Sequence, residues 1–193
     1  MNTPMPRPAL PTLALAGAAL FAATSAGAQQ LLPAGSEIAF TSRQMGVPVD
    51  GRFKTYTAQL AFDPKQPAAA KIAFTIDLAS VSLGAAETES EIAKADWFDT
   101  KRFPQASFQS TAVRATGAGR YEVAGTLKIK GASQAVLVPV TLAQTGATTT
   151  ATGAFAIRRL DFRIGDGDWK DTSMVADEVQ VRFRLALTGV APL

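Results

Sequence analysis

The chain has 193 residues, contains no cysteine and no histidine, and carries a formal net charge of +3. These absences exclude a serine–histidine–aspartate or cysteine–histidine nucleophile, a histidine-ligated zinc site and a histidine general base. The weak positive charge is spread along the chain without a basic run, so no nucleic-acid partner is expected.

Residues 1–28 are expected to be a secretory signal peptide. Arg7 supplies the positive charge, LALAGAALFAA forms the apolar run, and Ala26 and Ala28 occupy the A-x-A cleavage positions. A membrane anchor is the alternative, but the apolar run is well short of the roughly 20 residues that span a bilayer. The sequence therefore predicts export to the periplasm and a single mature domain at residues 29–193, stabilised by burial because it has no cysteine.

After the signal, apolar and polar residues alternate with a period of two, which is typical of strands with one buried face. The alternation is clearest near the C-terminus, where Val181 and Phe183 flank Arg182. Eight strands are predicted, at residues 38–43, 52–62, 71–78, 106–114, 121–130, 134–143, 149–158 and 178–187. One short helix, of about two turns, is expected at residues 88–95.

The alternation also predicts which side chains are buried, because a slip of one residue would exchange the two faces of a strand. The residues expected to point inward are Phe74, Ile76, Tyr121, Val123, Phe155, Ile157, Val181 and Phe183. Those expected to face solvent are Lys128, Lys130, Arg182 and Arg184. Eight such strands with short turns, including one at residues 48–51, form either a sandwich or a closed barrel, and the pattern leaves both open.

The acidic segment at residues 161–177 is interpreted as a solvated loop. Asp166, Asp168 and Asp171 lie close together, but a calcium loop needs alternating ligands and a terminal bidentate glutamate. A glycosidase pair of carboxylates would have to face each other across a cleft, which sequence neighbours do not indicate. Neither a metal site nor a catalytic residue is expected.

The segment ADWFDTKRFPQASFQST concentrates four aromatic rings, those of Trp97, Phe98, Phe103 and Phe108. These rings could form a hydrophobic plug that closes one end of a β domain. The alternative is that they line an apolar pocket, because ligand sites are mostly apolar with a few placed polar groups. Composition alone leaves both interpretations open.

Several blocks follow one another in a specific order along the mature chain. They are RQMGVPVDGRF, DLASVSLG, ADWFDTKRFPQASFQST, YEVAGTLKIKGASQAVLVPVTL, FAIRRLDFRIG and DEVQVRFRLAL. In this combination the chain resembles the YceI-like periplasmic proteins over nearly all of its mature length. The resemblance implies an all-β fold, an extended eight-stranded antiparallel lipocalin-like barrel with one short helix, around an elongated apolar cavity.

The resemblance further implies a binding or carrier protein, not an enzyme. The expected ligand is a polyisoprenoid, such as an isoprenoid quinone or a polyprenyl lipid, and no other cofactor. A binder of long-chain fatty acids or fatty amides that uses the same cavity is the alternative. Two other classes compete with a lipid binder: an enzyme that acts on such lipids, and an interaction domain with a filled core. Transient contact with a membrane is expected. The sequence does not indicate the oligomeric state.

The expected site combines aromatic residues of the resembling blocks with aromatic residues on the inward faces. The residues expected to line the cavity or its mouth are Phe53, Phe74, Trp97, Phe98, Phe103, Phe108, Tyr121, Phe155, Phe162 and Phe183. Arg159 and Asp161 are expected to act structurally nearby. An arginine beside a strand-end aspartate more often pairs with a carboxylate than meets a phosphate headgroup.

Overall fold

Antiparallel strands make up most of residues 28–193, the part of the chain that this computed structural model describes. The strands are β1 (Gln30–Gln44), β2 (Val47–Phe53), β3 (Tyr56–Ala61), β4 (Lys71–Asp77), β5 (Val81–Ser82), β6 (Gln105–Gly117), β7 (Arg120–Ile129), β8 (Ala132–Thr145), β9 (Thr148–Arg158) and β10 (Glu178–Thr188). The helices are α1 (Ala86–Ile92) and the short 3₁₀ helices η1 (Pro67–Ala69), η2 (Leu78–Ser80), η3 (Arg159–Phe162) and η4 (Gly167–Lys170). The expected signal peptide falls almost entirely on residues 1–27, which lie outside the described part. Within that part, no helix has both the length and the apolar character needed to cross a membrane.

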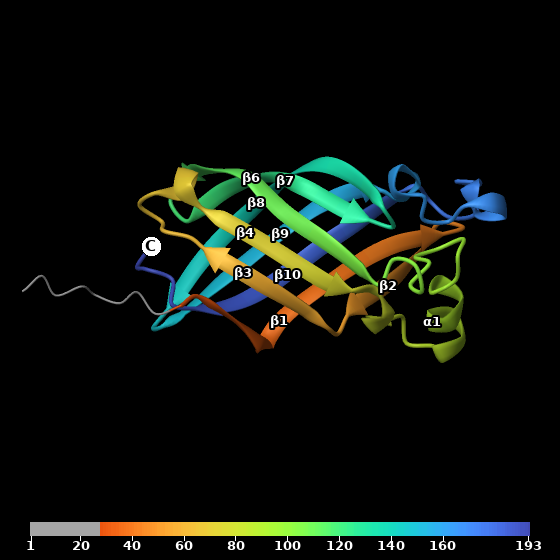
Figure 1. Ribbon diagram of the computed structural model, residues 1–193, viewed down its shortest axis with the longest axis horizontal. Helices are drawn as coiled ribbons and strands as arrows, with labels where there is room; N and C mark the ends of the chain where they lie inside the picture. Colours follow the sequence, from red (N-terminus) through yellow and green to blue (C-terminus); the bar gives the residue numbers. More distant parts are fainter. Residues whose placement is uncertain (1–27) are drawn as a thin grey trace, which may run out of the picture.

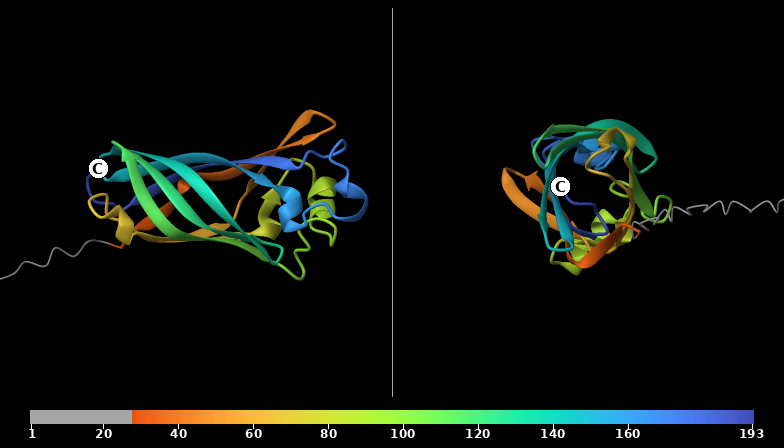
Figure 2. Two further views of the ribbon diagram at one scale, coloured as in Figure 1. Left: turned by 90° about the horizontal axis from the view of Figure 1, so that it is seen from above. Right: turned by 90° about the vertical axis from the view of Figure 1, so that its left-hand side faces the viewer.

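All ten strands belong to one sheet, in the order β3-β4-β6-β7-β8-β9-β10-β1-β2-β5. The sheet curls about the long axis of the molecule and surrounds an interior, as the end-on view in Figure 2 shows. Strands β1 and β3 lie close together but are not paired in the described sheet. At this seam the Gln29 side chain pairs with the backbone of Phe62, accepting from its N–H (2.9 Å) and donating to its carbonyl (2.5 Å).

The expected closed barrel of eight strands is therefore wrong in detail, because the structure is an open, curled sheet of ten strands. The strand predicted at residues 52–62 is divided after Phe53, where the Lys54 N–H donates to the Ser80 carbonyl at 3.1 Å. The chain then leaves β1, its partner before the break, and pairs with β4. The turn predicted at residues 48–51 lies instead within β2. Pro48 is tolerated there because β5 pairs only with the far end of β2, so no neighbour needs the missing N–H of proline.

The alternation predicts the buried faces correctly, with one exception. All eight residues expected to point inward line the interior, and Lys128, Arg182 and Arg184 are exposed. Lys130, however, is only 7% exposed. Strand β7 ends one residue earlier and Lys130 takes a positive φ of 47°, so the alternation of the strand does not extend to it.

The two ends of the molecule differ in construction (Figure 1). Both described termini lie at one end, which we call the terminal end. Helix α1 and the segments around η3 and η4 gather at the opposite end, which we call the helical end. The expected helix at residues 88–95 corresponds to α1, which begins two residues earlier and ends three residues earlier.

Arg159 organises the helical end. Its side chain is 2% exposed, and the five N–H groups of its guanidinium all donate to backbone carbonyls. Nε donates to Ala176 (3.1 Å), Nη1 to Ile164 (2.8 Å) and Gly165 (3.1 Å), and Nη2 to Trp169 (2.7 Å) and Val175 (2.8 Å). The expected carboxylate partner is therefore wrong. The backbone between β9 and β10 is irregular, so these carbonyls accept no hydrogen bond from a neighbouring strand, and the arginine N–H groups donate to them instead.

Replacing Arg159 with glutamine is expected to destabilise the protein strongly. Buried carbonyls would lose their donors, and breaking such a buried charged network costs about 3 to 5 kcal/mol. The free energy of unfolding, measured in urea, checks this. Arg184→Gln is the matched control, because this exposed arginine donates to a single carbonyl, that of Gly35, at 3.3 Å. Equal effects of the two substitutions would contradict the assignment.

Candidate functional site

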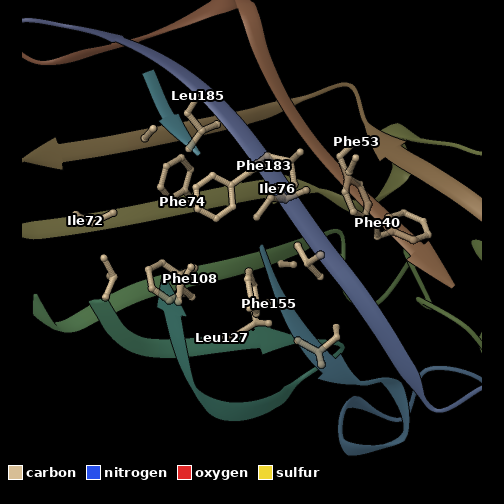
Figure 3. A pocket seen from close by; sticks show the side chains of 18 of the residues that line it. Phe40, Phe53, Ile72, Phe74, Ile76, Phe108, Leu127, Phe155, Phe183 and Leu185 are labelled. Carbon is tan, nitrogen blue, oxygen red and sulfur yellow. The ribbon is translucent and has the colours of Figure 1, made fainter. Parts of the chain in front are cut away.

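An apolar cavity of about 260 Å³ lies inside the curled sheet. Figure 3 shows its wall, in which rings from four different strands extend into the same space. These are Phe74 on β4, Phe108 on β6, Phe155 on β9 and Phe183 on β10. The strands place them there because each occupies the inward position of its alternation.

Three glycines lie beneath rings of this wall. A Cβ atom at Gly153 would lie 2.4 Å from Cζ of Phe183, its cross-strand partner on β10. Phe40 lies over its cross-strand partner Gly51 in the same way, at 2.3 Å. Phe108 lies over Gly125, two residues from its own cross-strand partner Leu127, at 2.4 Å. Because the glycines have no side chain, each ring lies against the backbone of its neighbour and leaves more of the central space open.

Polar side chains are few along the cavity. Those among its lining residues in the described chain are Gln29, Ser42, Thr149 and Arg159, together with the ring-borne groups of Tyr121 and Trp97. Arg159 is the only charged lining residue within residues 28–193, and burial lowers the pKa of its guanidinium. An arginine nevertheless keeps its proton, so a positive charge lies at the helical end.

Two buried polar atoms of the lining residues have no hydrogen-bond partner within residues 28–193, Trp97 Nε1 and Thr149 Oγ1. Thr149 lies next to the turn where β9 begins, at the terminal end. Trp97 lies at the helical end, between α1 and β6, where its ring approaches that of Trp169 with a centroid separation of 5.3 Å. Both atoms are buried within the wall, one toward each end of the cavity.

The structure brings together eight of the ten residues expected at the site. Phe53, Phe74, Trp97, Phe98, Phe108, Tyr121, Phe155 and Phe183 line the cavity. Phe103 lies outside it, 3.0 Å from the Cβ position of Gly131, with the Arg102 guanidinium over its ring. Phe162 is 1% exposed and packs in the core of the helical end. The aromatic segment therefore supplies part of the pocket wall through Trp97, Phe98 and Phe108, and ligand contact by the lining residues stays a prediction.

The sequence interpretation missed several lining residues. Phe40 was detectable, because it shares an inward face with Ile38 in a predicted strand. Gln29 and Thr149 carried no signal, since a polar residue in a strand is normally placed on the wet face. Val190 lies beyond the last predicted strand and reaches the cavity only because the chain folds back at the terminal end.

Asp177 fixes the turn that leads into η3, at the helical end of the cavity. Its carboxylate accepts from Arg158 Nε at 2.8 Å and from the Leu160 N–H at 3.0 Å, and its carbonyl accepts from the Arg159 N–H at 2.8 Å. Burial raises the pKa of Asp177, but the hydrogen bonds from Arg158 and Leu160 outweigh it, so the net pKa lies below its ordinary value.

The arrangement matches known proteins in both sequence and fold. The model of the YceI-like domain matches residues 30–187. The chain belongs to the YceI-like domain family. Among curated relatives, a UPF0312 protein of Shewanella baltica is 32% identical over 130 residues, which cover 65% of this chain and 68% of that protein. A UPF0312 protein of Ectopseudomonas mendocina is 33% identical over 88 residues, and the matched part spans about half the length of each chain.

Two solved structures show the same fold as this YceI-like domain. The crystal structure of Burkholderia cenocepacia BcnA is 46% identical, with a TM-score of 0.79, and the match covers 81% of this chain and 99% of that one. A polyisoprenoid binding domain from Saccharophagus degradans is 18% identical, with a TM-score of 0.68, and the match covers 86% and 99% of the two chains.

Substituting alanine for Gly153 is expected to destabilise the domain by about 1 to 3 kcal/mol, the usual cost of overpacking. The new Cβ would meet Phe183 and also the Pro139 carbonyl, at 2.5 Å, so ring and backbone would both have to move. Urea unfolding measures the change. Gly117→Ala is the control, because its Cβ would meet nothing closer than Arg120 Cδ at 3.8 Å. If Gly153→Ala unfolded at the wild-type urea concentration, the close approach of ring and glycine would be wrong.

The stability of the domain is expected to fall at acidic pH through Asp177. A carboxyl group whose pKa is lowered by folding stabilises the native state above its unfolded pKa of about 3.9. This contribution is lost as the pH falls through the lower native pKa. Asp177→Asn should therefore lower the free energy of unfolding at pH 7 and flatten its decline below about pH 5. Urea unfolding measured from pH 7 down to about pH 3, with the exposed Asp168→Asn as control, tests the assignment; identical pH profiles would refute it.

Proposed function

We propose that this protein is a periplasmic binding or carrier protein for a polyisoprenoid, such as an isoprenoid quinone or a polyprenyl lipid, held inside the curled sheet. The observation that carries the proposal is the apolar cavity, whose wall is built from rings and aliphatic chains of nine of the ten strands and from the loops between them. The protein from Saccharophagus degradans with the same fold is described as a polyisoprenoid binding domain, which supports this ligand class.

The energetics of an apolar chain are compatible with such a site. Each buried methylene contributes about 0.8 kcal/mol, so a five-carbon isoprenoid unit contributes roughly 3 to 4 kcal/mol before the costs of ordering. A few buried units therefore give useful affinity without a charged anchor. Binding of this kind needs no catalytic group, in agreement with a sequence that has neither histidine nor cysteine.

Export is part of the proposal, because a carrier of membrane lipids is useful in the aqueous space between two membranes. The signal-like sequence at residues 1–28 supports a periplasmic location, and transient contact with a membrane would let the lipid enter and leave. A binder of long-chain fatty acids or fatty amides remains the second candidate, since a linear chain also suits an apolar cavity.

The identity of the ligand class is tested by extracting protein purified from its native host into organic solvent and analysing the extract by mass spectrometry. We expect isoprenoid quinones or polyprenyl lipids in amounts comparable with the protein. Recovery of fatty acids or amides would support the second candidate. An extract without any lipid would contradict both.

The same extraction locates the ligand. Phe108→Ala removes a ring from the cavity wall and is expected to weaken binding about five- to thirtyfold, or about 1 to 2 kcal/mol. Lys128→Ala is the control, because Lys128 lies on β7, the strand paired with β6, but its side chain is exposed to solvent. Both variants should show the wild-type circular dichroism spectrum. Equal lipid content in the two variants would show that the ligand lies elsewhere.

A further inference from the structure

The strands β8 and β9 separate toward the helical end. They pair with each other only over residues 140–145 and 148–153. Over residues 132–139, strand β8 pairs with β7 alone, and over residues 154–157, strand β9 pairs with β10 alone. We call these two stretches the fork. The fork is therefore a place inside the sheet where no backbone ladder joins two neighbouring strands.

Pro139 ends the ladder between the two strands. Its carbonyl oxygen lies 2.5 Å from the position of a Cβ atom on Gly153, so this carbonyl faces β9. In a strand, the N–H and the C=O of one residue point toward the same neighbour. Proline has no N–H, so the hydrogen bond to β9 that would come next in the ladder is missing. Beyond this point β8 and β9 are held by side chains such as Val136 and Phe155, which pack in the same core cluster.

The outer side of the fork carries no charge. Its exposed residues on the two strands are Ser133, Ala135, Leu137, Pro139, Ala154 and Ala156. Leu137, in the middle of this surface, is 57% exposed. The exposed positions of β10, on the other side of β9, are instead occupied by Glu178, Gln180, Arg182 and Arg184. A continuous exposed surface that is largely apolar marks a site of interaction with a protein or a membrane.

The fork adjoins the apolar cavity. Where the ladder ends, a hollow on the outer surface is lined by Pro139 and Ala154 of the fork. Three further residues, Tyr121, Val140 and Phe183, line both this outer hollow and the interior cavity. A single layer of side chains therefore separates the outer surface from the cavity next to the fork.

Free positive charges border the fork at both ends. Arg120 lines the outer hollow, and Arg163 follows η3, which lies against β8. Both arginines are exposed and form no ion pair within residues 28–193. Two carboxylates nearby are each opposed by another arginine: Glu122 forms a salt bridge, and Asp161 acts on Arg158. This arrangement complements a surface of anionic headgroups.

A second group of exposed apolar side chains is a weaker candidate for such a contact. Met45 and Val47 lie at the turn between β1 and β2, and the Met45 N–H donates to the Met174 carbonyl at 2.8 Å. The loop that carries Met174 also presents the exposed carboxylates of Asp168 and Asp171, which repel an anionic surface. None of these five residues is among the described lining residues of the cavity.

We propose that the outer face of the fork docks on a membrane that presents anionic headgroups. Leu137 and its uncharged neighbours lie in the interface, Arg120 and Arg163 contact the headgroups, and the lipid passes between β8 and β9. This inference rests on the proposed function, to which it adds the surface and the kind of membrane at which the lipid is exchanged.

Binding to vesicles tests the docking surface. The full mature chain is sedimented with vesicles of phosphatidylglycerol and phosphatidylethanolamine in equal amounts, or of phosphatidylcholine alone. The wild type should bind the anionic vesicles more tightly. Leu137→Glu should weaken this binding about tenfold or more, because it replaces a buried leucine in the interface with a charge. Val47→Glu is the matched control, since it makes the same change at a residue that is 62% exposed, and it should bind as the wild type does.

A second pair of variants tests the charges. Arg120→Gln combined with Arg163→Gln should weaken binding to the anionic vesicles by about fivefold for each arginine. The control combines Arg52→Gln with Lys71→Gln, which removes the same charge at exposed positions on β2 and β4, outside the fork. This control should bind as the wild type does. Equal losses in the two double variants would show that only the net charge matters, and the docking surface would be wrong.

Several other results would overturn the inference. These are wild-type binding by Leu137→Glu, loss of binding in Val47→Glu instead, and failure of the wild type to bind anionic vesicles. A wild-type dimer that Leu137→Glu dissociates in sedimentation velocity would make the fork a contact between two copies of the chain. Circular dichroism confirms that each variant is folded.

The lipid extracted from the wild type distinguishes failure of the docking surface from failure of the proposed function. Lipid in the extract together with any of these contrary results would leave the proposed function standing without the docking surface. An extract without lipid would contradict the proposed function, and the inference with it.

Discussion

The guanidinium of Arg159 connects the parts of the molecule on which the cavity depends. It lies where β9 ends and collects five carbonyls from the irregular segment before β10. Without a donor, those carbonyls would have to turn outward to water, and the segment could not fold across the helical end. Asp177 and the buried Lys130 reinforce the same region, since the Lys130 ammonium donates to the Arg163 carbonyl at 2.6 Å.

This use of arginine also explains why a positive charge beside an apolar cavity does not make an anion site. A guanidinium binds carboxylate or phosphate through its fork of N–H groups, and here the fork is already occupied by backbone. Arg159 keeps its positive charge, but all five of its N–H groups already donate to backbone carbonyls. The chemistry of the cavity is therefore decided by its apolar wall.

Glycine and aromatic residues together decide how much of the interior stays open. Protein interiors are normally packed to the density of organic crystals, so an eight- or ten-stranded sheet with large side chains at every inward position would fill itself. Where a ring covers a glycine, as Phe183 covers Gly153, one inward position is left without a side chain. An open interior buries less apolar surface than a filled core, and the domain has no cysteine that could form a stabilising disulfide instead. The close contacts of these rings with the neighbouring backbone therefore contribute both to stability and to the shape of the cavity.

The sequence by itself determined the strand-rich class, the faces of the strands and most of the cavity-lining rings, because side-chain direction in a strand alternates locally. It also excluded catalysis that needs histidine or cysteine. Only the tertiary structure decided where strands change partners, as at Phe53, and how the sheet remains open between β1 and β3, since both depend on hydrogen bonds between residues far apart in the chain. The carbonyl partners of Arg159 likewise depend on which backbone groups the folded chain brings beside its guanidinium, and a local pattern of residue types carries no information about that.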